Sequence, residues 1–379
     1  MKNARHSNGL KENLTRLDPN LARVFVPFAF HHPSKLWVYG RLLRAYKQSV
    51  QKRQSAKLNG SSVPPVLILS ITSRCNLKCA GCYAAAVGTV HSHVSENATG
   101  KQGLNLDQWR NIIQQASDLG VSGFILAGGE PFMFPNLLAL CEEFKNRVFV
   151  IFTNGTALTE QDFTRLKHLP NVLVVISIEG NQDVTDLRRG QGVYEKAYGT
   201  LKRLNKLGVV TGVSVTITRL NYEYWMTNTS LDQLITQGVR FGFFIEYIPA
   251  SLLPNDLLGL SKDERIAFRA KIMEYRAEKS IYLVHSPGDE EFFGGCISAG
   301  RGFAHVTPEG DLTPCPVSNI ATHNLTEASL GDGLNSPLFQ RIRESEHLNE
   351  NGDTPCALFA HPHEVEELAQ VMRAYRTGR

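Results

Sequence analysis

Three cysteines lie within one short segment of the chain. Cys75, Cys79 and Cys82 lie within eight consecutive positions of the stretch SRCNLKCAGCYA, although the whole chain of 379 residues contains only seven cysteines. In a reducing compartment, clustered cysteines more often bind metal or do chemistry than form disulfides. A structural zinc ion normally takes two cysteine pairs, and no second pair lies nearby. A four-iron cluster normally takes four cysteines, so three would leave one iron open to a small molecule. The segment therefore predicts a reactive metal site.

Short apolar runs rich in β-branched residues alternate with amphipathic helical stretches from Val66 onward. The six candidate strands are residues 66–72, 123–129, 148–155, 172–180, 209–218 and 241–249. Runs that are almost wholly apolar are typical of strands buried on both faces of a parallel sheet. Six successive β-α units predict an α/β fold built on a partial (β/α)6 TIM-type barrel, and an open doubly wound sheet would share the pattern. In a barrel, Cys75 would follow the first strand onto the face where active sites gather.

The chain divides into three regions by composition. We expect a basic helical N-terminal extension over 1–64, a core barrel over 65–284 and a small α+β domain over 285–379. The last region is rich in Gly, Pro, Asn and His and contains Cys296, Cys315 and Cys356. Within it, the stretch TPEGDLTPC predicts a hairpin that ends at Cys315.

The cysteine spacing C-x3-C-x2-C resembles the cluster motif of the radical S-adenosylmethionine (SAM) enzymes. Four more stretches agree with that family in order and in position at strand ends. They are GGEP (128–131), TNGT (153–156), SIEG (177–180) and LRRGQGVYEKA (187–197). The resemblance implies that Cys75, Cys79 and Cys82 hold a [4Fe–4S] cluster whose fourth iron binds SAM. The reduced cluster would cleave SAM, and the resulting 5′-deoxyadenosyl radical would abstract hydrogen from a substrate. The substrate would be a peptide, a tetrapyrrole or another small molecule, and the reductant a protein such as flavodoxin or ferredoxin.

The same resemblance assigns SAM contacts to residues at or near the strand ends. They are Gly128, Gly129, Glu130, Asn154, Ser177, Arg189 and Tyr83. A carboxylate at Glu130 suits the methionine ammonium group. The planar guanidinium of Arg189 suits a carboxylate, although Arg188 could take that place. The family often has an aromatic residue just before the third cysteine, lying against the adenine. Here that residue is Gly81, so Tyr83 is the aromatic candidate, with a core position as its alternative.

The C-terminal cysteines resemble the ligands of SPASM and twitch domains, which hold auxiliary iron–sulfur clusters. Cys296, Cys315 and Cys356 are fewer than a SPASM domain uses, so the fourth ligand of such a cluster would be open or would not be cysteine. The candidate histidines are His305, His361 and His363. The alternative is three small buried side chains packed in a core.

Two polar residues end the sixth candidate strand. Glu246 and Tyr247 are our candidates for substrate contact or proton transfer, since they lie at the predicted reaction face. Side chains alternate along a strand, so only one of the two can face inward.

The N-terminal region is strongly basic. Residues 1–60 carry a net charge of +10 and the remainder −6. Apolar residues at helical spacing from Leu36 to Tyr46 predict a helix that covers one end of the barrel. It could instead lie on an anionic membrane surface or bind an acidic partner. No nucleic-acid-binding module is recognisable, so a nucleic-acid substrate is disfavoured. We see neither a membrane-spanning run nor a secretion signal and expect a cytoplasmic protein.

Two rival functions share most of these features. A non-catalytic iron–sulfur protein would keep the cysteines for electron transfer or scaffolding, and a nucleic-acid modifier would use the basic region. The SAM-contact residues Glu130, Ser177 and Arg189 favour a catalyst over the first of these.

Overall fold

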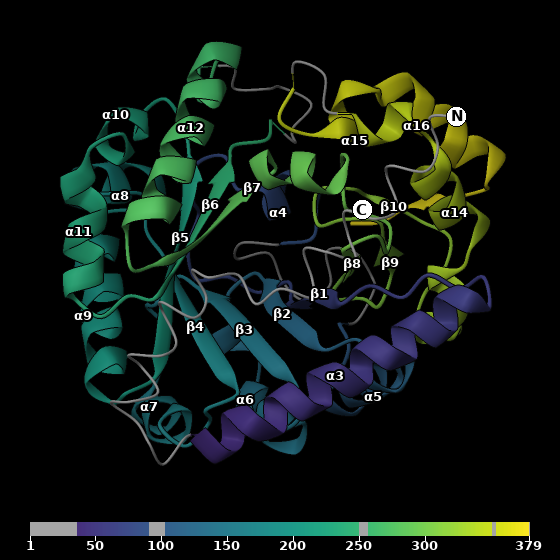
Figure 1. Cartoon of the computed structure of the whole chain (residues 1–379), viewed down its shortest axis with the longest axis horizontal. Coiled ribbons are helices and arrows are strands. Elements are labelled where there is room, and N and C mark those ends of the chain that lie inside the picture. Colours follow the sequence, from purple (N-terminus) through teal and green to yellow (C-terminus); the bar gives the residue numbers. More distant parts are fainter. Residues whose placement is uncertain (1–35, 91–102, 250–256, 351–353, 379) are drawn as a thin grey trace.

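The computed structural model describes residues 36–90, 103–249, 257–350 and 354–378. Its central sheet contains nine strands. They are β1 (Val66–Thr72), β2 (Gly123–Gly128), β3 (Val148–Thr153), β4 (Val172–Ser177), β5 (Val210–Ile217), β6 (Phe241–Glu246), β7 (Tyr282–Ser286), β8 (Phe303–Val306) and β9 (Leu312–Thr313). Their spatial order is β7-β6-β5-β4-β3-β2-β1-β8-β9, and all neighbours pair in parallel except β8 and β9 (Figure 1). The curved parallel sheet confirms the predicted α/β partial barrel.

All six predicted strands are present, and five of them end one to three residues earlier than predicted. The predicted ranges extended into loops that follow the strands. Gly128, for example, has φ of +119°, a conformation that glycine adopts without strain and that ends the regular ladder. The motif residues at strand ends therefore lie in loops at the mouth of the barrel.

The sheet extends past the predicted barrel at both edges. β7 pairs with β6 and spans residue 284, the predicted end of the barrel domain, and β8 pairs with β1. This pairing provides hydrogen-bond partners for backbone N–H and C=O groups that β1 and β6 would otherwise expose as edge strands. Leu283 in β7 and Ala304 and Val306 in β8 belong to the same apolar core as the barrel. The predicted boundary thus cuts through a strand, and the C-terminal region shares the sheet. The predicted hairpin before Cys315 is confirmed by the antiparallel pair β8–β9.

Helices cover the outer face of the sheet (Figure 1). They include α5 (Leu106–Leu119), α6 (Leu137–Glu143), α7 (Glu160–Leu166), α8 (Gln182–Arg189), α9 (Val193–Lys206), α10 (Tyr222–Trp225), α11 (Asn228–Thr236) and α12 (Lys262–Glu278). Alternate strand residues such as Leu67, Leu69 and Ile71 are buried with helix residues such as Trp109. The intervening positions, among them Ser177, therefore face the barrel interior.

Beyond the sheet, the C-terminal region consists of short elements. They are η3 (Gly288–Phe293), β10 (Ile320–Ala321), α13 (Leu330–Leu334), α14 (Pro337–Glu344), η4 (His347–Asn349), α15 (Ala357–Ala360), α16 (Pro362–Val371) and β11 (Tyr375–Arg376), with β10 and β11 forming a second small sheet. Their apolar residues join the core of the barrel.

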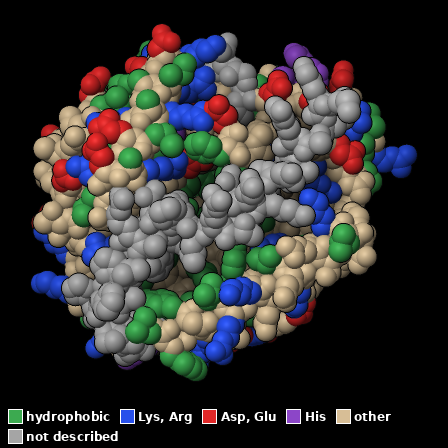
Figure 2. Space-filling model, viewed as in Figure 1, with side chains coloured by type: hydrophobic (Ala, Val, Ile, Leu, Met, Phe, Trp, Pro, Cys, Tyr) green, Lys and Arg blue, Asp and Glu red, His purple; other side chains and the backbone are tan. Residues whose placement is uncertain are grey.

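The basic N-terminal helix lies across one end of the barrel. This helix, α3 (Leu36–Leu58), contributes Tyr39, which packs against a cluster of inward-facing strand residues that includes Leu173, Val175 and Phe241. Arg53 Nη1 donates to Gly120 O at 2.5 Å, at the carboxyl end of α5, where a cation also favours the helix dipole. The predicted covering helix is confirmed. Figure 2 shows that basic and hydrophobic side chains occupy the outer surface where α3 lies. The rest of the predicted extension, residues 1–35, lies outside the described residues.

No helix in the described part of the chain has both the length and the apolar character needed to cross a membrane.

Candidate active site

The cysteine segment forms a loop between β1 and the short helix α4 (Tyr83–Ala86), whose N-cap residue is Cys82. The thiols of Cys75, Cys79 and Cys82 are free and half-buried. Burial raises the pKa of Cys75 to about 11, and the neighbouring Glu130, Cys79 and Cys82 add to the rise. The three sulfurs therefore lie within electrostatic range of one another. Within the described residues, no three Cys, His, Asp or Glu side chains converge closely enough to hold a single metal ion. Three soft sulfur donors on one loop fit an iron–sulfur cluster, which is larger than a single ion.

The GGEP loop supports the base of the cysteine loop. Gly129 N donates to Thr72 O and Glu130 N donates to Arg74 O, both at 2.8 Å. A Cβ added to Gly129 would come within 2.0 Å of Arg74 O, so only glycine permits this approach. The backbone N–H groups of residues 129 and 130 are thus engaged with the segment that leads to Cys75.

The Glu130 side chain points into the protein. It is 1% exposed, and its carboxylate accepts hydrogen bonds from Thr153 Oγ1 at 2.6 Å, Asn154 N at 2.8 Å and Phe132 N at 3.1 Å. Burial raises the pKa of this carboxyl, while the same hydrogen bonds and Arg189 oppose the rise. The expected direct contact between Glu130 and a SAM ammonium is therefore not what this geometry favours. Its carboxylate joins the ends of β2 and β3.

Asn154 connects the end of β3 to the cysteine loop. Its Nδ2 donates to Asn76 Oδ1 at 2.8 Å, and Asn76 Nδ2 donates to Thr156 Oγ1 at 2.8 Å. Asn154 Oδ1 also accepts from Thr156 N at 2.8 Å. Asn154 thus lies beside the cysteine loop, and its contacts position residue 76, next to Cys75.

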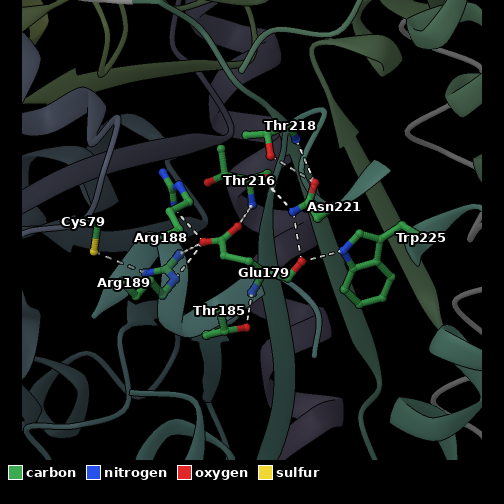
Figure 3. Close-up of polar contacts among 9 residues, drawn as sticks. All are labelled: Cys79, Glu179, Thr185, Arg188, Arg189, Thr216, Thr218, Asn221 and Trp225. Carbon is green, nitrogen blue, oxygen red and sulfur yellow. Dashed lines mark hydrogen bonds and ion pairs between the residues drawn. The ribbon is translucent and has the colours of Figure 1, made fainter. Parts of the chain in front are cut away.

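Two arginines from α8 converge on one buried carboxylate beside the cysteine loop (Figure 3). Glu179 is fully buried, and its Oε1 accepts from Arg188 Nη1 at 2.5 Å and from Arg189 Nε at 2.7 Å. Glu179 Oε2 accepts from Thr216 N at 3.1 Å in β5. Arg189 Nη1 lies 4.0 Å from Cys79 Sγ, so the side chain of Arg189 is the one that contacts the cysteine loop. Arg188 instead holds the loop by its backbone, since its carbonyl accepts from Ala80 N at 2.8 Å.

Glu179 is itself fixed by its backbone. Its carbonyl accepts from Asn221 Nδ2 and Trp225 Nε1, both at 2.9 Å, and its N–H donates to Thr185 Oγ1 at 3.1 Å (Figure 3). The sequence interpretation did not single out Glu179. The available signal was its place in SIEG, two residues after Ser177 and therefore on the same face. Ser177 ends β4 half-buried, and no side-chain hydrogen bond engages its hydroxyl among the described residues.

Tyr247 and Glu246 lie on opposite faces of the strand end, as alternation requires. A Cβ added to Gly81 would meet Tyr247 Cε2 at 2.7 Å, so the tyrosine ring lies against the cysteine loop. Glu246 is on the helix-covered face, where its Oε1 is 3.0 Å from His285 Nε2. The His285 ring packs edge-on against Phe268 of α12. Glu246 therefore lies away from the face where substrate contact is expected, and Tyr247 is the one of the two that lies against the cysteine loop.

Tyr83 follows Cys82 on α4. Burial raises the pKa of its phenol, and Cys82 and Cys315 add to the rise. Tyr83 is therefore within electrostatic range of both Cys82 and Cys315.

The C-terminal cysteines are buried and mutually close. Burial raises the pKa of Cys315 well above its usual value, with further contributions from Cys356 and Cys296. Of the three candidate histidines, His305 is used elsewhere. Its Nε2 is 2.8 Å from Ser70 Oγ and its Nδ1 is 2.7 Å from Thr313 Oγ1, which leaves no ring nitrogen for a metal.

The other two histidines are near the start of α16. His361 Nδ1 pairs with Glu364 Oε1 at 3.4 Å, and the His363 residue is exposed.

Comparison with known proteins agrees with this geometry. Residues 69–228 match the model of the radical SAM superfamily, and residues 296–358 match an iron–sulfur cluster-binding domain named SPASM. The first match contains Cys75, Cys79 and Cys82, and the second runs from Cys296 past Cys356. The chain belongs to the radical SAM superfamily. It carries a C-terminal SPASM domain, as the resemblance in the sequence implied.

Curated relatives of this radical SAM chain include a maturation protein and a heme synthase. The sporulation killing factor maturation protein SkfB of Bacillus subtilis is 24% identical over 288 residues, which cover 73% of this chain and 66% of SkfB. The AdoMet-dependent heme synthase of Methanosarcina barkeri is 24% identical over 315 residues, covering 76% and 87%. The chain thus spans slightly less than two thirds of SkfB and most of the heme synthase.

Among solved structures, SuiB of Streptococcus suis bound to its precursor peptide SuiA has a TM-score of 0.64 at 19% identity. The match covers 79% of this chain and 71% of SuiB. At this identity the likeness shows the fold. The family supplies the cofactors: the radical SAM domain uses a [4Fe–4S] cluster and SAM, and the SPASM domain holds auxiliary iron–sulfur clusters.

Proposed function

We propose that this chain is a radical SAM maturase in which Cys75, Cys79 and Cys82 hold the SAM-binding cluster. When bound and reduced, that cluster supplies an electron that cleaves SAM to a 5′-deoxyadenosyl radical, which takes hydrogen from an unreactive C–H bond. The contact of Arg189 with Cys79 carries the proposal, because it brings a guanidinium to the loop that would hold SAM.

The surrounding residues hold and shape the SAM site. Arg189 is fixed by Glu179 through Nε and Nη2, and its Nη1, on the side of the cysteine loop, is the donor that we assign to the SAM carboxylate. Ser177 presents a hydroxyl to the same interior and offers a donor to the ribose or carboxylate. The backbone of Gly128 and Gly129 forms the wall nearest the cysteine loop, while Glu130 and Asn154 keep that wall and residue 76 in place. These residues thereby orient SAM and exclude water from the reacting atoms.

Tyr247 and Tyr83 lie next to the reaction region on two sides. Tyr247 packs on Gly81, where its ring supplies an aromatic wall for the adenosyl group. Tyr83 lies toward Cys315, and we propose that the SPASM cysteines Cys296, Cys315 and Cys356 would hold an auxiliary cluster, which would supply an electron acceptor for oxidation of the substrate. This assigns oxidation of substrate to the C-terminal region.

A peptide is the substrate class that the relatives favour. SkfB is named as a maturation protein, and SuiB was solved with a precursor peptide. A tetrapyrrole is the second candidate, because the heme synthase aligns over 87% of its own length. A flavodoxin or ferredoxin would supply the electron, as in the family generally.

The test is SAM cleavage by anaerobically reconstituted protein with dithionite. Wild type is expected to form 5′-deoxyadenosine, and Cys79→Ser is expected to form none. Cys141→Ser is the matched control, because Cys141 is a fully buried cysteine on α6 remote in sequence from both motifs. Failure of iron-loaded wild type to form 5′-deoxyadenosine would favour the non-catalytic iron–sulfur protein. A rise in product with a pool of peptides, but not with iron porphyrins, would separate the two substrate classes.

A further inference from the structure

The helix α3 has an outward face that is both basic and apolar. The helix contains six Lys and Arg residues and no acidic residue. Its buried residues, Ala45 and Ser49, identify the face that packs on the barrel. The exposed residues on the opposite side of the helix form the outward face. They are Leu36, Trp37, Leu43, Arg44, Lys47 and Leu58.

Large apolar side chains gather near the start of this face. Trp37 is 72% exposed, Leu36 52% and Leu43 45%. The Arg41 guanidinium lies 5.0 Å from the centre of the Trp37 ring, so a cation accompanies the indole. Exposed apolar side chains that lie together indicate an interaction site, whereas single ones on a surface are ordinary.

The loops beside α3 add to its positive charge. Arg41 Nη2 donates to Lys145 O at 3.2 Å, so the loop before β3 lies next to the helix. In a parallel barrel the loops that precede the strands lie at one end, and those before β4 and β5 carry Lys167 and Lys206. All three lysines are exposed. The end of the barrel that α3 covers is therefore positively charged.

Two acidic residues at the end of α6 do not offset this charge. Glu142 Oε1 pairs with Arg165 Nε at 2.8 Å, and Glu143 Oε2 pairs with Arg110 Nε at 2.5 Å. Each carboxylate is thus matched by a guanidinium of its own. The lysines of the neighbouring loops and the cations of α3 remain as excess charge.

An anionic lipid surface fits this combination better than an acidic protein does. Lys and Arg near an anionic membrane are attracted to its headgroups, and Trp, Phe and Leu beside them enter the boundary with the acyl chains. The sequence just before α3 adds the apolar stretch VFVPFAF (24–30), which contains three phenylalanines. An acidic protein would pair with the cations but would not account for the exposed Leu36 and Trp37.

The mouth of the barrel lies at the opposite end of the strands from α3. The helix contacts Gly120, which precedes β2, and Lys145, which precedes β3. Cys75 instead follows the last residue of β1. A membrane beneath α3 would therefore leave the cysteine loop accessible to substrate and reductant.

We propose that the outward face of α3 binds the anionic surface of a membrane. Phosphate headgroups contact Arg44 and Lys47, and the Trp37 ring enters the boundary between headgroups and acyl chains. The inner face of the same helix covers the barrel, so the two roles do not compete. The inference goes beyond the proposed function and does not depend on SAM chemistry.

The test is flotation of full-length, iron-reconstituted protein with lipid vesicles. One set of vesicles contains phosphatidylcholine alone, and the other contains equal parts of phosphatidylcholine and phosphatidylserine. The variants are the double change Arg44→Gln with Lys47→Gln, and the single change Trp37→Ser. The matched control is Lys196→Gln with Arg341→Gln, which removes two exposed cations from α9 and α14. Melting temperature and iron per chain verify that each variant is folded.

We expect wild type to float with the phosphatidylserine vesicles but not with phosphatidylcholine alone, and to be released as salt screens the charges. Each cation should contribute about a fivefold change in affinity, so the α3 double variant should bind about 25-fold more weakly. Trp37→Ser should bind about tenfold more weakly, because it buries less apolar area. The control double variant should bind like wild type.

No binding of wild type to phosphatidylserine vesicles at low salt would overturn the proposal. An equal loss in the control would also overturn it, because attraction would then depend on net charge rather than on α3. Binding to polyglutamate but not to vesicles would assign the face to an acidic protein instead. A wild-type dimer in size-exclusion chromatography that dissociates in Trp37→Ser, without vesicle binding, would assign it to a second copy of the chain.

Discussion

The ring of Tyr247 occupies the space beside Gly81 that any larger residue would need. Tyr247 directly follows β6, and Gly81 lies in the cysteine loop with φ of +64°. A Cβ at residue 81 would be 2.7 Å from Tyr247 Cε2 and 3.6 Å from Leu258 Cδ1. The missing aromatic residue before the third cysteine therefore has a structural counterpart, because an aromatic side chain from another strand fills that place.

This relationship predicts that Gly81→Ala will loosen the cysteine loop. The positive φ and the contact with Tyr247 each oppose a Cβ, and the combined cost should be about 2 kcal/mol of stability. We expect a lower melting temperature and less iron bound per chain. Adding Tyr247→Ala should recover only the part due to the clash, since the backbone strain remains. Full recovery in the double variant, or no loss in Gly81→Ala, would contradict this account.

Replacement of the buried carboxylate at Glu179 should be among the most damaging single changes at the site. Glu179→Gln leaves Arg188 and Arg189 buried without their anion, at a cost of about 3 kcal/mol. We also expect roughly tenfold weaker SAM binding by equilibrium dialysis, equivalent to about 1.4 kcal/mol, because Arg189 is no longer held toward Cys79. The control is Glu160→Gln, which removes an ion pair with Arg203 on the surface and should change neither property. Equal effects from the two variants would refute the assigned role.

The buried side chain of His305, in β8 next to β1, should make the stability of the protein depend on pH. Thr313 Oγ1 donates to Cys315 O at 3.1 Å, so it accepts from His305 Nδ1–H, and His305 Nε2 accepts from Ser70. This neutral tautomer is buried, and burial lowers the pKa of His305 to about 3. The unfolded chain binds a proton near pH 6.5, whereas the folded protein does not until about pH 3.

Stability from this residue is therefore complete above about pH 6.5 and is lost as the pH falls toward 3. Between pH 7.5 and 5.5 the loss should be about 1.4 kcal/mol. Thermal unfolding of holoprotein at the two pH values measures it. His305→Gln should be less stable at pH 7.5 but should lack this part of the pH dependence. A variant with the full wild-type slope would show that another group is responsible.

The basic helix α3 has a structural role that its charge alone does not reveal. Arg53→Met removes the hydrogen bond to Gly120 O and a favourable charge at the carboxyl end of α5, and should cost about 1–2 kcal/mol. Lys57→Met removes an exposed cation of the same helix and should leave the melting temperature close to wild type. If both variants melt alike, α3 is not anchored through Arg53.

The sequence predicted the elements that depend on local pattern. The apolar runs identified six strands, and the placement of motifs at their ends identified the mouth of the barrel. The alternation of side chains along a strand also predicted correctly that Glu246 and Tyr247 could not both face inward, but it did not indicate which of the two does. That choice depends on the packing of His285 and Phe268 on the outer face, which comes from residues distant in sequence.

Sequence patterns did not predict the contacts that form only when the chain folds. Glu179 meets the two arginines only after α8 folds back on β4. β7 and β8 are short, with a histidine in each, so neither has the uniform apolar character of the other strands. Their places are set by pairing with β6 and β1, and pairing order cannot be deduced from local composition.

The central claim is that three cysteines on one loop hold a cluster with an iron open to SAM. The most direct test is electron paramagnetic resonance (EPR) spectroscopy of dithionite-reduced, iron-loaded wild type with and without SAM. We predict that one of two reduced-cluster signals changes on SAM addition and that this signal is missing in Cys79→Ser. Spectra identical with and without SAM, from protein with its full iron content, would contradict the account.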